Sequence, residues 1–171
     1  GWYIAAAELN PLVIEAQKTI SFEIIEQYGV PDYIIVPMGD GGTLYSLWKG
    51  FNEYLKLGIC DKLPKMVGVQ AEECSPIVNS YRKNALEITP VRNAKTRALA
   101  ILVCSPYLGK QALSAIKKSN GIAVSVSDRE IVESERVLAR TEGIFVEPAS
   151  AATIDTVCSI SDNAVQVRIK Y

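Results

Sequence analysis

The chain has 171 residues, of which 49% are hydrophobic and 22% charged, a composition typical of one globular domain rather than of a disordered segment. Lys and Arg number 18 and Asp and Glu 19, so a net charge of −1 gives no electrostatic reason to expect nucleic acid or a membrane surface as a partner. No apolar run approaches the roughly 20 residues that a transmembrane helix needs, and we expect a soluble chain.

Short apolar runs alternate with longer amphipathic stretches from the start of the chain, which predicts parallel strands joined by helices. Residues 2–7 are short and apolar and are a strand candidate. Asn10 and Pro11 are typical of a helix start. Apolar residues then recur at spacing four, which predicts a helix that ends near Gly29.

The middle of the chain contains two runs that are apolar throughout, as in strands covered on both faces. These predicted strands are residues 33–37 and 65–71. Apolar spacing of three and four predicts a helix between them at 43–55 and a short one after them at 75–84. Residues 84–106 carry no regular pattern.

The remaining residues continue the alternation. They predict a helix at 109–119 that Gly121 ends, and a strand at 122–126. A further helix is predicted from the S-x-x-E capping box at Ser127 to about Thr141, and Gly143 is a suitable residue for its C-terminal end. A helix at 149–157 and a possible closing strand at 164–169 follow. The fold class that results is α/β, a doubly wound and mostly parallel sheet with helices on both faces, in a single domain spanning 1–171.

The absence of histidine limits the chemistry that this chain can perform alone. Neither a Ser-His-Asp triad nor a Cys-His pair can be built from its residues. Cysteines stand at 60, 74, 104 and 158 without a C-x-x-C spacing, so we expect no metal site. Free, buried thiols in a reducing cytoplasm are the expected state of these cysteines.

The stretch Gly39-Asp40-Gly41-Gly42-Thr43 lies between the predicted strand 33–37 and the predicted helix 43–55. Asp-Gly is a hairpin signal when strands flank it, but the spacing after this loop is helical. A loop between a strand and a helix instead offers unpaired main-chain amides and the helix dipole to an anion. The residue types alone leave open whether residues 39–43 bind a phosphate.

Asp40 is the residue in this loop that opposes an anion. Two negative unit charges about 4 Å apart repel each other by about 4 kcal/mol at an effective dielectric of 20. The helix dipole contributes only ~0.3–1 kcal/mol toward an anion. We therefore expect the Asp40 carboxylate to turn away from a bound phosphate, or to cap the following helix.

Several motifs in order resemble the pyridoxal-phosphate enzymes of the tryptophan-synthase-β fold, and among them the threonine synthases. The chain has NPLVIEAQKT at 10–19, GDGGT at 39–43, WKGF at 48–51, KTRALAI at 95–101 and EGIFVEPASAA at 142–152. The resemblance implies pyridoxal phosphate as cofactor, with its phosphate on Gly39, Asp40, Gly41, Gly42 and Thr43. It also implies conversion of O-phosphohomoserine to threonine and phosphate in the full-length enzyme, in biosynthesis, and a homodimer.

The resemblance does not extend to the catalytic part of these enzymes. Their Schiff-base lysine lies upstream of the phosphate loop, in a segment that this chain lacks, and none of its 11 lysines stands in that context. The T-G-x-G segment that contacts the pyridine nitrogen is also not visible. We therefore assign no catalytic residue, expect the isolated chain to be inactive, and expect the missing N-terminal segment to be its partner.

Two further groups are weaker candidates for the site. Glu147 to Ser150 would line the ring side of the cofactor by resemblance, or form a plain turn. Gln70, Ala71 and Glu72 follow a strand end, where pocket residues gather, although an ordinary loop is the favoured interpretation.

Two alternative functions remain open. One is another enzyme of the same fold, a serine/threonine dehydratase or a cysteine synthase. The other is a non-catalytic module that binds a phosphorylated ligand. The N-P…Q-K-T and E-G-I-F-V-E-P-A-S-A-A stretches favour a threonine synthase, whereas the missing lysine and the charge of Asp40 favour the module.

Overall fold

A parallel sheet of three strands forms the centre of the molecule, in the order β1-β2-β3. The computed structural model describes Trp2 and residues 9–163, with side chains described up to residue 157. The strands are β1 (Tyr33–Pro37), β2 (Lys65–Ala71) and β3 (Ile122–Val126), all three as predicted. β2 is central, and its residues after Lys65 are all buried. Apart from Trp2, the strand candidates at 2–7 and 164–169 lie outside the described residues.

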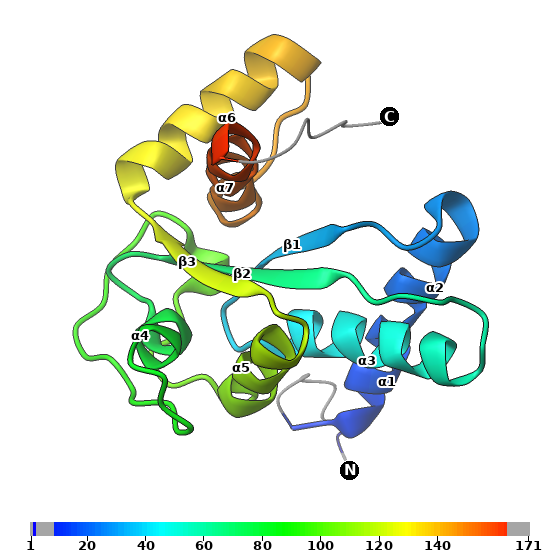
Figure 1. Ribbon diagram of the computed structural model, residues 1–171. Coiled ribbons are helices and arrows are strands. Elements are labelled where there is room, and N and C mark those ends of the chain that lie inside the picture. The colour runs from blue at the N-terminus through cyan, green and yellow to red at the C-terminus, as the bar shows by residue number, and fades with distance from the viewer. Residues whose placement is uncertain (1, 3–8, 164–171) are drawn as a thin grey trace.

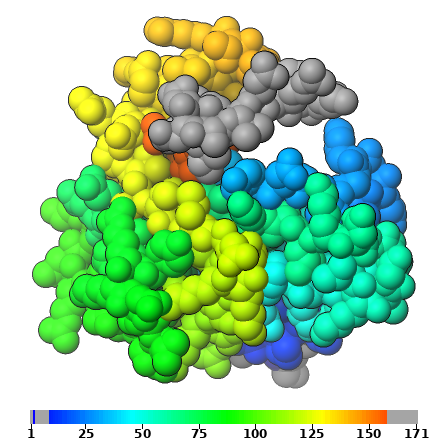
Figure 2. Space-filling view, viewed as in Figure 1, coloured from blue at the N-terminus to red at the C-terminus, as the bar shows by residue number. Residues whose placement is uncertain are grey.

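Helices cover both faces of this sheet, which confirms the predicted α/β class (Figure 1). On one face lie α6 (Asp128–Glu142) and α7 (Pro148–Asn163). The other helices are α1 (Pro11–Gln17), α2 (Thr19–Tyr28), α3 (Gly42–Lys56), α4 (Pro76–Arg82), α5 (Gly109–Lys118) and the short 3-10 helix η1 (Leu99–Ile101). Two apolar clusters result, one mainly between the sheet and α3, α4 and α5, the other between the sheet and α7. Figure 2 shows the same face in space-filling form, with residues of α6, coloured yellow, above the green segment that follows β2.

The helix predicted from Asn10 to Gly29 is two helices. Asn10 caps the first as predicted, since its side-chain oxygen accepts from the Leu12 amide at 3.1 Å. The chain tightens at Lys18, whose amide donates to the Glu15 carbonyl three residues back. The Thr19 hydroxyl donates to the Ala16 carbonyl at 2.8 Å, a side-chain bond that competes with regular helix pairing.

Gly121 does not end α5 in the way predicted. The helix ends at Lys118, and Asn120 is the residue in the left-handed region, with φ 52°. Gly121 is needed for space instead, because a Cβ on it would lie 1.9 Å from the Met66 carbonyl oxygen of β2. Asparagine is among the few residues that adopt a left-handed conformation readily, so it replaces glycine in that role.

The capping box predicted at the start of α6 is present. The Ser127 hydroxyl accepts from the Glu130 amide, and the Glu130 carboxylate accepts from the Ser127 amide at 2.8 Å. The hydrogen bonds from the Ser127 hydroxyl and amide lower the pKa of Glu130. Gly143 ends this helix in the left-handed region, with φ 67°, as predicted.

Ser127→Ala is expected to lower the free energy of unfolding by about 1 kcal/mol at neutral pH, the usual cost of a lost N-cap. The pKa of Glu130 is lowered from its usual value of 4.5. The stabilisation that the ionised Glu130 carboxylate gives is therefore complete above pH 4.5, and it is lost as the pH falls through the lowered pKa. Urea unfolding of both proteins at a series of pH values from 7 downward measures the effect. A cost that stays constant down to the pH at which acid itself unfolds the protein would contradict the role of the carboxylate.

Among the helices of residues 9–163, none is long and apolar enough to cross a lipid bilayer.

Candidate cofactor-binding site

The glycine loop joins β1 to α3 directly, at the carboxyl edge of the parallel sheet. Because β1 pairs with β2 in parallel, the loop is not a hairpin turn. The helical spacing of the apolar residues after the loop had predicted this. The Met38 amide still donates to the Val69 carbonyl at 2.7 Å, so the strand is anchored one residue before the loop. Gly41, in the left-handed region with φ 95°, is the N-cap of α3, and its carbonyl accepts from the Tyr45 amide.

A side chain would be crowded at each of the three glycines of this loop. A Cβ on Gly39 would lie 3.0 Å from the Ala100 carbonyl oxygen, and one on Gly41 would lie 2.7 Å from the Ala112 Cβ. On Gly42 it would lie 3.2 Å from a methyl carbon of Leu108. The backbone here is therefore packed closely against α5 and residues 100–108, and the approach is tightest at Gly41.

The main-chain amides at the start of the glycine loop have no acceptor in the part of the chain that the structure describes. Among residues 9–163, no backbone or side-chain oxygen accepts from the N–H groups of Gly39, Asp40, Gly41 and Gly42. Gly41 and Gly42 are buried, whereas Gly39 and Asp40 are half-buried and Thr43 is exposed. Buried N–H groups in folded proteins nearly always have a partner, and residues 9–163 supply none for these amides. A phosphate fits this set of donors at the start of a helix.

Asp40 does not cap α3, and this alternative for its role is wrong. Its carboxylate accepts from the Tyr107 amide at 2.5 Å and from the Leu108 amide at 3.3 Å. Because α5 begins at Gly109, these amides belong to the positive end of another helix, which stabilises a carboxylate. Asp40 thus anchors residues 107–108 to the glycine loop.

Gln70 lies close to the site but has a structural role. Its side chain is fully buried at the end of β2. The side-chain oxygen accepts from the Ile77 and Val78 amides at 2.9 and 3.1 Å, which satisfies the first turn of α4. The side-chain nitrogen donates to the Met38 carbonyl at 3.3 Å. The favoured interpretation of an ordinary loop is wrong for Gln70 and Ala71, which lie within β2. A glutamine in an otherwise apolar run was the only signal in the sequence for this role.

The family of the chain follows from comparison with known proteins. A family profile described as pyridoxal-phosphate dependent enzyme matches residues 1–166. The chain belongs to this family. The predicted cofactor, pyridoxal phosphate, is thereby confirmed for the family, and the loop described above offers donors that suit its phosphate group.

Relatives within the family carry the name threonine synthase. That of Methanocaldococcus jannaschii is 51% identical over 148 residues, which cover 85% of this chain and 36% of the relative. That of Methanosarcina acetivorans is 47% identical over 159 residues, which cover 92% of this chain and 39% of the relative. The chain thus spans less than two-fifths of the length of these relatives.

Solved structures of the family share the fold. A threonine deaminase from T.th. has a TM-score of 0.73 at 26% identity, over 92% of this chain and 56% of that one. A maize serine racemase has a TM-score of 0.71 at 18% identity, over 90% of this chain and 43% of that one. The predicted fold is therefore the fold of these enzymes.

Glu147 to Ser150, the other segment that the family resemblance suggested, begins α7. The Glu147 carbonyl accepts from the Ala151 amide at 3.0 Å, and Ala149 is buried against the sheet. The Glu147 side chain is exposed. A role of this segment beside the cofactor ring stays a prediction.

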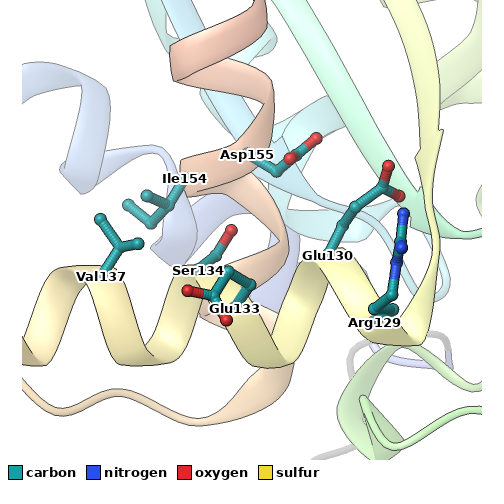
Figure 3. A pocket seen from close by; sticks show the side chains of 7 residues that line it. All are labelled: Arg129, Glu130, Glu133, Ser134, Val137, Ile154 and Asp155. Carbon is teal, nitrogen blue, oxygen red and sulfur yellow. The ribbon is translucent and has the colours of Figure 1, made fainter.

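A cavity of about 400 Å³ lies between α6 and α7, on the face of the sheet opposite to α3 (Figure 3). Its lining residues are Arg129, Glu130, Glu133, Ser134, Val137, Ile154 and Asp155. Burial, together with the Glu130 carboxylate, raises the pKa of Asp155. None of the glycine-loop residues lines this cavity, so the cavity and the glycine loop are separate features of the fold.

Proposed function

We propose that this chain supplies the cofactor-phosphate portion of a threonine synthase. The whole enzyme would convert O-phosphohomoserine and water to threonine and phosphate. The observation that carries the proposal is the set of loop amides at the start of α3, two of them in buried glycines, that find no acceptor among residues 9–163. The names of relatives at 47% and 51% identity support the choice of reaction.

The residues that would hold the cofactor are Gly39, Asp40, Gly41, Gly42 and Thr43. Their amides would bind the phosphate, and the exposed Thr43 hydroxyl offers a further donor. The dipole of α3 would add ~0.3–1 kcal/mol. The Asp40 carboxylate is already engaged by two amides of residues 107–108, which removes part of its cost to a nearby phosphate. Pyridoxal phosphate, when bound, supplies a pyridine ring that withdraws electrons from the substrate.

The proposal also concerns how the chain is organised. Residues 1–171 would form one α/β unit within a larger, homodimeric enzyme. Another segment of that enzyme would supply the lysine that forms the Schiff base with the cofactor. The three described cysteines that are free, Cys60, Cys74 and Cys104, support a reducing compartment such as the cytoplasm.

Titration of the ¹⁵N-labelled chain with inorganic phosphate, followed by NMR, tests the loop. We expect the amide signals of Gly39 to Thr43 to shift, because these donors are free to bind an anion. The amides of Ile77 and Val78 are an internal control, since the Gln70 oxygen already occupies them. Sodium chloride at equal ionic strength controls for screening. Shifts that avoid the loop, with both phosphate and pyridoxal phosphate, would overturn the proposed site.

The reaction is tested on the product of the parent gene, which joins this chain to whatever the gene encodes around it. Release of phosphate from O-phosphohomoserine, with threonine formed in equal amount, is expected. Release of ammonia from threonine or serine in its place would identify a dehydratase. Cofactor binding without turnover of any of these substrates would favour a non-catalytic module.

A further inference from the structure

The segment of residues 95–102, which contains η1, is tied by hydrogen bonds to a single carboxylate elsewhere in the fold. Asp128, the first residue of α6, accepts from the Thr96 hydroxyl at 2.6 Å and from the Arg97 amide at 3.0 Å. The Thr96 hydroxyl in turn accepts from the Ala98 amide at 3.1 Å. In the described part of the chain, every other hydrogen bond of residues 95–102 is local, to a residue two or three positions away.

The η1 segment, residues 95–102, also packs against the glycine loop. Its Ala98 and Ile101 side chains are buried in the apolar cluster between the sheet and α7. The Ala100 carbonyl oxygen lies 3.0 Å, and the Ile101 Cα 3.3 Å, from where a Cβ of Gly39 would stand. The position of this backbone therefore limits where Gly39 can lie, and with it the amide that Gly39 offers to a ligand.

Two aspartates anchor the chain on either side of this contact. Asp128 holds the start of the η1 segment, whereas the Asp40 carboxylate accepts from the Tyr107 and Leu108 amides after it. Residues 102–107 between them contain no helix or strand, so regular structure does not fix their path. Hydrogen bonds to a carboxylate are stronger than bonds between neutral groups, which suits both aspartates to this task.

We propose that Asp128, acting through Thr96, is a positioning residue for the cofactor-phosphate loop. It holds the η1 segment against Gly39, so that the loop amides stay directed at one point. When this anchor is lost, a smaller fraction of the molecules has a loop that is ready to bind, and the apparent affinity falls by that fraction. The effect on phosphate binding rests on the proposed function, whereas the anchor itself does not.

Phosphate titration of ¹⁵N-labelled variants, followed at the loop amides by NMR, measures the effect on binding. In Thr96→Val we expect the midpoint concentration to rise by roughly two- to tenfold, the range that the net contribution of one hydrogen bond allows. Thr96→Ser should keep the wild-type midpoint, because it keeps the hydroxyl. Asp128→Ala should weaken binding at least as much, and adding Thr96→Val to it should change little further. A wild-type midpoint in Thr96→Val would overturn the proposal.

Ser127→Ala is the control for a general loss of stability. It weakens the start of α6, next to Asp128, but the Ser127 hydroxyl bonds only to Glu130 within the capping box. We therefore expect Ser127→Ala to keep the wild-type midpoint of the phosphate titration. A rise as large as that in Thr96→Val would show that loosening α6 is enough, and would overturn the positioning role.

Amide hydrogen exchange without phosphate tests the anchor by itself. We expect the Arg97 amide to exchange slowly in the wild type and faster in Asp128→Ala, because the carboxylate is its acceptor. The Gly39 amide signal should shift in the same variant. An Arg97 amide that is unprotected in the wild type, or a Gly39 signal that stays in place, would overturn the inference. Absence of phosphate binding in the wild type contradicts the proposed function instead, and these two signals still decide the anchor.

Discussion

Gly121→Ala is expected to lower the free energy of unfolding by about 3 kcal/mol or more, the upper part of the range for forcing atoms into a packed core. The new Cβ would lie 1.9 Å from the Met66 carbonyl oxygen and 2.8 Å from its carbonyl carbon. These are backbone atoms of the central strand, so they cannot rotate away. Gly121 is also held by its amide, which donates to the Ile116 carbonyl, and by its carbonyl, which accepts from the Tyr81 hydroxyl.

Gly68→Ala is the matched comparison for this substitution. Its Cβ would also be crowded, at 2.3 Å, but by the terminal methyl carbon of the Met38 side chain. Because a methionine side chain can change rotamer, we expect a smaller loss of stability. Urea unfolding of both variants measures the two losses. If Gly121→Ala cost no more than Gly68→Ala, the close approach of this backbone to β2 would be wrong.

Gly41→Ala is expected to combine a loss of stability with a loss of phosphate binding. The left-handed conformation at φ 95° costs a residue with a Cβ about 1–2 kcal/mol. The contact of 2.7 Å with the Ala112 Cβ adds an overpacking cost of roughly 1–3 kcal/mol. Either the loop backbone or α5 must move in response, and both changes misdirect the amides. The phosphate-induced NMR shifts of the loop should therefore disappear.

Gly58→Ala separates strain from site geometry. Gly58 also has a positive φ, 70°, but no atom lies within 4 Å of its Cβ position. We expect the free energy of unfolding to fall by about 1 kcal/mol because of the backbone strain alone. The phosphate-induced NMR shifts of the loop should stay as in the wild type. Phosphate shifts in Gly41→Ala that equal those of the wild type, in a folded protein, would show that the loop amides are not the binding site.

The secondary structure was largely predictable from local patterns. The three strands are apolar runs, and the helices carry spacings of three and four, because each element must turn an apolar face to one core. The capping box at Ser127 and the stop at Gly143 were visible because both depend on residues close in sequence. The helix break at Lys18 was not visible, since it depends on a competing bond from the Thr19 hydroxyl.

The sequence by itself determined the α/β class, the place of the glycine loop between β1 and α3, and, through its motifs, the family. Only the tertiary structure decided what Asp40 and Gln70 do. Their partners are main-chain amides, seven residues away for Gln70 and 67 residues away for Asp40. Contacts between residues so far apart in the sequence depend on how strands and helices pack against one another. The spacing of apolar and polar residues within one element does not predict that packing.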